Sequence, residues 1–131
     1  TQANNQLIKY GACEERLWPS TNVTRSGGIN RKYYTEEAKA NALLYRVTEY
    51  WDHQSRNFLS KASAVVRGVP VSSGYNFMGH QMMTCRIIIN SNGSLGCVDL
   101  DSYGQNGDFS QQALSESRGA ADDMVSPRVA T

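Results

Sequence analysis

The sequence predicts an α+β fold, with a small antiparallel sheet whose central hairpin packs against two helices. Asn92-Gly93 stands between two apolar runs, residues 83–89 and 94–100, and is a strong hairpin signal because both residues tolerate positive φ. Residues 35–60 repeat apolar side chains every three or four positions, which is typical of a helix packed on a sheet. Residues 107–125 are predicted to form a second helix. The order helix, strand, hairpin, helix favours helices covering one sheet face.

Both predicted helices have a start signal. Thr35 is an N-cap followed by Glu36 and Glu37, whose charges favour the positive end of the helix dipole. Asp108 is the N-cap of the second helix, and Gln111 stands three residues later.

The remaining segments are less regular. Residues 63–74 are rich in β-branched side chains and predict a strand, which Pro70 would place at a sheet edge. Residues 1–34 are predicted to be irregular with one strand at 5–12, and residues 126–131 a loose tail. The length of 131 residues predicts a single domain.

Composition restricts the partners that we expect. Thirteen basic and 12 acidic side chains give a formal charge of +1 without blocks of like charge, so nucleic acid is not an expected partner. No apolar run approaches the roughly 18 residues of a membrane span, so membrane attachment would need a segment absent from this sequence. The polar start "TQANNQ" suggests a mature or trimmed chain. Polar residues outweigh Lys and Glu, which favours a periplasmic or secreted protein.

The three cysteines, Cys13, Cys85 and Cys97, are too scattered for a metal site, and no cofactor is expected. With a two-residue turn, the numbers of paired hairpin residues add up to 185, and in this register Cys85 and Cys97 point to opposite faces of the sheet. With a three-residue turn in which Gly93 has a left-handed conformation, the numbers add up to 184. Cys85 and Cys97 are then diagonal neighbours on one face, about 7–8 Å apart. Neither register suits a disulfide. If a disulfide exists, we expect it to join Cys13 and Cys85.

Two histidines, His53 and His80, are the candidate bases near neutral pH. Asp52 precedes His53, but neighbours on a helix point about 100° apart and do not orient each other. A Cys–His nucleophile would need the fold to bring a cysteine beside one histidine, and no local signature accompanies any of the three.

An aromatic and methionine cluster precedes the first hairpin strand. Such side chains either belong to the core or, when exposed, form an adaptable contact surface, and we take them as the candidate binding patch. Its members are Tyr75, Phe77, Met78, Met82 and Met83.

The run "CRIIINSNGSLGCVDLDSYGQNGDFSQQALSESRGA" resembles the C-terminal domains of TolA and TonB, envelope proteins of Gram-negative bacteria. The shared pattern is a strand, a turn, a second strand, a Gly-rich link and a helix with a basic side chain, here Arg118. The segment "YRVTEYW" corresponds to the helix that precedes the sheet in TolA. The final strand of that family has no counterpart at "VSPRVAT", although residues 5–12 could replace it.

The resemblance implies a non-enzymatic periplasmic module that binds protein partners of the cell envelope. Colicins or the adsorption domain of filamentous phage would be further partners, and an exposed sheet edge could accept their strands. Two alternatives remain open from the residues themselves. One is a small secreted hydrolase using His53 or His80, and the other is a subunit of a pilus or surface assembly.

Overall fold

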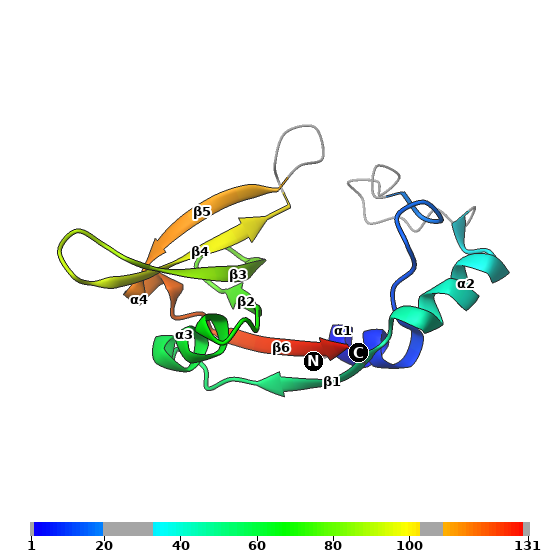
Figure 1. Ribbon diagram of the computed structural model, residues 1–131, viewed down its shortest axis with the longest axis horizontal. Helices are drawn as coiled ribbons and strands as arrows, with labels where there is room; N and C mark the ends of the chain where they lie inside the picture. Colours follow the sequence, from blue (N-terminus) through cyan, green and yellow to red (C-terminus); the bar gives the residue numbers. More distant parts are fainter. Residues whose placement is uncertain (1, 20–32, 103–108, 130–131) are drawn as a thin grey trace. The chain divides into compact units, whose positions relative to one another are not determined.

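The computed structural model describes residues 2–19, 33–102 and 109–129 (Figure 1). The helices are α1 (Gln2–Tyr10), α2 (Glu36–Ala42), the 3-10 turn η3 (Leu43–Tyr45), α3 (Phe58–Val66) and α4 (Glu116–Gly119). The strands are β1 (Val47–Asp52), β2 (Val71–Tyr75), β3 (His80–Ile89), β4 (Leu95–Asp101), β5 (Ser110–Ser115) and β6 (Asp123–Val129).

The strands form a six-stranded antiparallel sheet in the order β1-β6-β2-β3-β4-β5. The α+β class is therefore confirmed, although the sheet is larger than the sequence suggests. The chain divides into two compact units, Thr1–Tyr50 with Pro127–Thr131, and Trp51–Ser126. We call them the first and the second unit and describe each by itself. The single-domain assignment stays a prediction.

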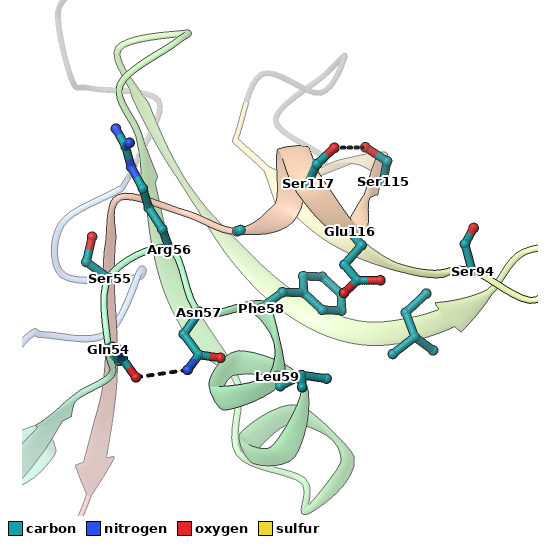
Figure 2. A pocket seen from close by; sticks show the side chains of 12 residues that line it. Gln54, Ser55, Arg56, Asn57, Phe58, Leu59, Ser94, Ser115, Glu116 and Ser117 are labelled. Carbon is teal, nitrogen blue, oxygen red and sulfur yellow. Dashed lines mark hydrogen bonds between the residues drawn. The ribbon is translucent and has the colours of Figure 1, made fainter.

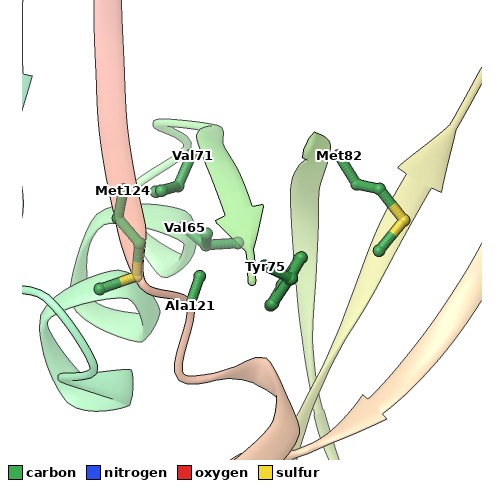
Figure 3. Packing of buried hydrophobic residues seen from close by; sticks show 6 residues of the cluster. All are labelled: Val65, Val71, Tyr75, Met82, Ala121 and Met124. Atoms are coloured by element: carbon green, nitrogen blue, oxygen red, sulfur yellow. The ribbon is translucent and has the colours of Figure 1, made fainter. Parts of the chain in front are cut away.

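The core of the second unit forms where α3 packs against β2 and β3. One cluster of buried side chains draws on α3, β2, β3, β6 and the segment before β6 (Figure 3). Its members are Val65, Val71, Tyr75, Met82, Ala121 and Met124. Phe58, Ala62 and Cys97 form a second buried cluster. Asn57 is the N-cap of α3, and its side-chain oxygen accepts a hydrogen bond from the Ser60 amide at 3.0 Å.

The predicted hairpin is confirmed as β3 and β4. Ile89 pairs with Leu95 and Ile87 with Cys97, which is the register of the longer turn, and Gly93 has the expected positive φ of 82°. The first of the two apolar runs, predicted at residues 83–89, belongs to a longer strand, because β3 begins at His80 and includes Gln81 and Met82.

The long helix predicted over residues 35–60 is wrong. Thr35 does cap a helix, but α2 ends after two turns, and Arg46 takes an extended conformation with ψ of 144°. The next residues form β1, whose sequence VTEYWD is rich in the β-branched and aromatic side chains that favour strands. The apolar side chains of residues 35–60 therefore belong to α2, η3, β1 and the start of α3, and they only happen to fall at intervals of three and four residues.

The second helix is also wrong over most of its length. Residues 110–115 form β5, whose side chains alternate between half-buried and exposed as a strand requires, and only Glu116–Gly119 are helical. Pairing along the whole of β4 outweighs the helical propensity of this segment. Asp108 lies outside the described residues.

Three shorter predictions also need correction. The strand at residues 5–12 is instead helix α1 followed by Gly11, which has a positive φ of 75°. The strand at 63–74 is correct only from Val71 onward, since α3 extends to Val66. The loose tail at 126–131 is wrong as far as Val129, because β6 continues to that residue.

Candidate active site

His80 and Asp101 meet across the central hairpin. His80 is the first residue of β3 and Asp101 the last of β4, and the imidazole Nε2 lies 2.9 Å from the carboxylate Oδ1. Because a carboxylate only accepts hydrogen bonds, Nε2 carries the hydrogen and Nδ1 is the basic nitrogen of the neutral ring. This orientation of an imidazole by a buried carboxylate is the arrangement used by general bases.

The carboxylate is itself held in place. Asp101 is only 4% exposed, and the Nε2 amide of Gln112 donates to its Oδ2 at 2.7 Å. Gln112 comes from β5, which runs beside β4. Both carboxylate oxygens therefore have protein partners, and the carboxylate cannot rotate freely relative to the imidazole.

His53, the other candidate base, has a different environment. Its Nε2 lies 2.8 Å from the Ser126 hydroxyl and its Nδ1 lies 3.4 Å from the Ser60 hydroxyl. Burial lowers the pKa of His53, and the nearby charge of Asp52 opposes this effect only in part. With hydroxyls on both ring nitrogens, His53 is suited to joining α3 to β6.

The cysteines of the second unit do not approach His80. Cys85 follows it by five positions in the same strand, which corresponds to roughly 16 Å at the usual rise. Cys97 is fully buried four residues before Asp101, and burial raises the pKa of its thiol to about 12. Cys13 belongs to the first unit. All three are free thiols in the structure, and the Cys13–Cys85 disulfide, which would join the two units, stays a prediction.

The candidate binding patch does not form one surface. Tyr75 and Met82 are 1% and 3% exposed and belong to the core, whereas Phe77 is 51% exposed. The guanidinium of Arg118 lies 4.7 Å from the centre of the Phe77 ring, which is a cation–π contact. Met78 and Met83 are half-buried. Only the exposed members could contact a partner, and their role in binding stays a prediction.

A buried polar network lies beside the candidate site, and sequence analysis missed it. Lys61 is fully buried, and its Nζ donates to the Tyr75 hydroxyl at 2.8 Å. That hydroxyl in turn donates to Asp99, two residues before Asp101 on the same face of β4. One signal was available: Lys61 occupies a core position in the α3 stripe between Phe58 and Val65, where a lysine needs a partner.

A pocket in the second unit lies away from His80. It has a volume of about 720 Å³ and is formed by residues 54–59, the start of β4 and the β5–α4 segment (Figure 2). Leu95 lines it, and Leu95 and Asp101 stand at opposite ends of β4, roughly 20 Å apart. A separate pocket of about 560 Å³ in the first unit is lined by Tyr10, Trp18 and Tyr34 among others.

Within the described residues, no group of three His, Cys, Asp or Glu side chains could hold a metal ion. Over the same residues, the helices are all too short or too polar to cross a membrane.

No family model matches the chain, and no curated protein matches it in sequence. Solved structures of proteases match it in fold. Procathepsin L 3 from the larval midgut of Tenebrio molitor has a TM-score of 0.71 at 17% identity, over 97% of this chain and 47% of that one. The bromelain protease of Ananas comosus, solved with the inhibitor E64, has a TM-score of 0.66 at 17% identity, over 98% of this chain and 68% of that one. A recombinant stem bromelain precursor has a TM-score of 0.67 at 16% identity, over 99% of this chain and 49% of that one.

These comparisons overturn the resemblance to TolA and TonB. The matched folds are those of papain-like cysteine proteases and their precursors, and so the assignments as a non-enzymatic module, a periplasmic TolA-like protein and a phage receptor are wrong. The hairpin and Gly-rich link that suggested TolA occur in many sheets, which is why they misled. The chain spans about half the length of the procathepsin and of the bromelain precursor, and it shares with them the fold of that part.

Proposed function

We propose that this chain is the histidine-bearing part of a cysteine protease, in which His80 is the general base and Asp101 orients it. The observation that carries the proposal is the 2.9 Å hydrogen bond from His80 Nε2 to the buried Asp101 carboxylate. The fold shared with proteases supports it, since papain-like enzymes use a Cys-His-Asn constellation. Asp101 would take the place of the orienting Asn in that constellation.

The chemistry follows from the position of the two ring nitrogens. Nδ1 of His80 takes the proton from a cysteine thiol, and the thiolate attacks the carbonyl carbon of a peptide bond. The resulting imidazolium is stabilised by Asp101 and returns its proton to the leaving amine, which leaves a thioester. Water then hydrolyses the thioester, again with His80 as base, so that the thiol and the neutral imidazole are regenerated.

The nucleophile is proposed to lie outside these 131 residues. Cys97 is enclosed in the core, and Cys85 lies about five residues along the strand from the histidine. In papain-like proteases the catalytic cysteine precedes the histidine by about 130–150 residues. His80 has 79 residues before it, and Cys13 precedes it by only 67. A cysteine N-terminal to Thr1 would satisfy this spacing.

The proposal can be tested by labelling the complete natural protein that contains this chain with E64 and locating the adduct by mass spectrometry. We expect one labelled cysteine outside residues 1–131. Replacing His80 with Ala should slow labelling about 10²–10⁴-fold, the range contributed by a general base. His53→Ala is the matched control, because it removes a histidine of the same unit that lies outside the site.

Two results would contradict the proposal. One is an adduct on Cys13, Cys85 or Cys97, which would remove the argument for an external nucleophile. The other is labelling that His80→Ala leaves unchanged.

A location outside the cytoplasm belongs to this proposal, because the procathepsin that this chain matches in fold is a digestive protein of the larval midgut. The periplasm in particular has no support from the comparisons. The expectation that the protein binds envelope proteins stays a prediction. The expectations that it binds no nucleic acid and no metal also stay predictions.

A further inference from the structure

Strand β3 contains a bulge one residue long. From the turn to Arg86 the strand pairs with β4 in one register, Ile89 with Leu95 and Arg86 with Val98. Beyond Cys85 the register shifts by one, and Thr84 pairs with Asp99. Cys85 is therefore the extra residue, without a partner on β4, and its side chain is exposed.

The bulge determines which face of the sheet His80 occupies. Side chains alternate along a strand, so a shift of one residue moves every later side chain to the other face. In the register of Arg86 and Val98, an unbroken strand would set Thr84 opposite Leu100, and His80 would then lie on the face away from Asp101. In the observed register Thr84 faces Asp99, and His80 shares the face of Asp101.

The shifted register is held by Asp99 and its buried partners. The Thr84 hydroxyl donates to Asp99 Oδ1 at 2.7 Å, and the Tyr75 hydroxyl donates to Asp99 Oδ2. The Ser73 hydroxyl lies 2.9 Å from that of Thr84, and Lys61 donates to Tyr75 from α3. Each of these side chains is at most 1% exposed, so a slip back to the unbroken register would leave buried polar groups without partners.

We propose that the Cys85 bulge, held by the buried Thr84–Asp99 hydrogen bond, is the device that positions His80 against Asp101. Thr84 and Asp99 are then positioning residues for the base. This inference explains how the fold places His80 beside Asp101. It rests on the proposed function only for the role of His80 as a base. The geometry itself can be tested without any activity.

The test compares Thr84→Val and Asp99→Asn with two control changes at Cys85, its deletion and Cys85→Ala, in the complete natural protein, selectively labelled with 15N-histidine. Amide exchange and near-UV circular dichroism report whether each variant folds. Long-range 1H–15N spectra report the hydrogen on Nε2 of His80, and His53 in the same protein is an internal reference. We expect Cys85→Ala to keep the Nε2–H signal and its protection from exchange. Deletion of Cys85 makes Thr84 adjacent to Arg86, so Thr84 still pairs with Asp99, now in a strand without a bulge. A folded deletion variant should therefore also keep the signal, while the His53 signal stays unchanged in both.

Thr84→Val and Asp99→Asn keep Cys85 in the strand and weaken the hydrogen bond that holds the bulge in place. Thr84→Val removes the hydroxyl that bonds Asp99 at nearly constant shape, and we expect at least tenfold faster exchange of the His80 Nε2 hydrogen. Asp99→Asn should act in the same direction. The proposal is overturned if Cys85→Ala or a folded deletion variant loses the protected Nε2–H, or if Thr84→Val and Asp99→Asn both leave it unchanged.

These outcomes are separable from those of the labelling experiment. A protected Nε2–H that depends on Thr84 and Asp99, together with E64 labelling that does not need His80, would retain the geometry and reject the protease. Loss of labelling in His80→Ala with an unaltered Nε2–H in Thr84→Val and Asp99→Asn would reject the role of the bulge and retain the protease.

Discussion

The Nζ of Lys61 lies 2.8 Å from the hydroxyl oxygen of Tyr75, and neither side chain is more than 1% exposed. The same hydroxyl donates to Asp99, so a phenol joins a buried cation to a buried carboxylate. Burial lowers the pKa of Lys61, and the charge of Asp99 opposes that effect. The pKa of Tyr75 is strongly raised, first by burial and then by its bond to Asp99, which keeps the phenol protonated as a donor.

Lys61→Met should destabilise the protein by about 3–5 kcal/mol, because it leaves the buried Asp99 carboxylate without its cation. Combining it with Asp99→Asn should recover part of this loss, since the remaining group is then neutral. Urea unfolding followed by circular dichroism measures both. Lys9→Met, at an exposed lysine, is the control and should change the free energy of unfolding by less than about 0.5 kcal/mol. Equal effects at Lys61 and Lys9 would contradict the network's role.

The stability of the protein should fall in mild acid because of His53. Its pKa is lowered from 6.5 in the folded state, so the unfolded chain binds the proton at a higher pH. The contribution of His53 is therefore complete above pH 6.5 and decreases as the pH falls from 6.5 toward the folded pKa. Urea midpoints measured between pH 8 and pH 4 should decline less steeply in His53→Gln. An identical pH dependence in both proteins would contradict this prediction.

Cys97 should resist alkylation in the folded protein. Its side chain is fully buried and burial raises its pKa to about 12, so almost none of it is thiolate at neutral pH. Cys85 is exposed, although burial of part of its surface and the charge of Asp99 also raise its pKa. Iodoacetamide followed by peptide mapping should modify Cys85 well before Cys97. In 6 M urea the two should react at similar rates, and rapid labelling of folded Cys97 would be the contrary result.

Gly119→Ala should destabilise the second unit by about 1–3 kcal/mol through overpacking. A Cβ at this position would come within 2.7 Å of Cys97 Sγ and 3.0 Å of the Phe58 ring. Cys97→Ala removes the sulfur, and the double variant should therefore be more stable than the sum of the two single changes predicts. Additive effects in thermal unfolding would show that the two positions do not share this space.

The sequence could predict elements with strong local signals. Asn92-Gly93 predicted the β3–β4 hairpin, and Thr35 predicted the start of α2, because turn geometry and capping depend on a few adjacent residues. Residues 47–52 and 110–115 are strands although their sequence predicts helix, because short apolar runs fit helix and strand periods alike. These residues become strands because β1 pairs with β6 and β5 pairs with β4, and local sequence patterns do not show these pairings.

The candidate site shows the same division. The residues alone indicate that His53 and His80 are the available bases and that Cys85 and Cys97 are poor disulfide partners. The tertiary structure distinguishes His80 from His53 as the candidate base. The distinction depends on the Asp101 carboxylate, which is 21 residues from His80, and on the bulge that brings both side chains to one face of the sheet. A one-residue register shift reverses the direction of a side chain while leaving the composition and local pattern of the strand unchanged.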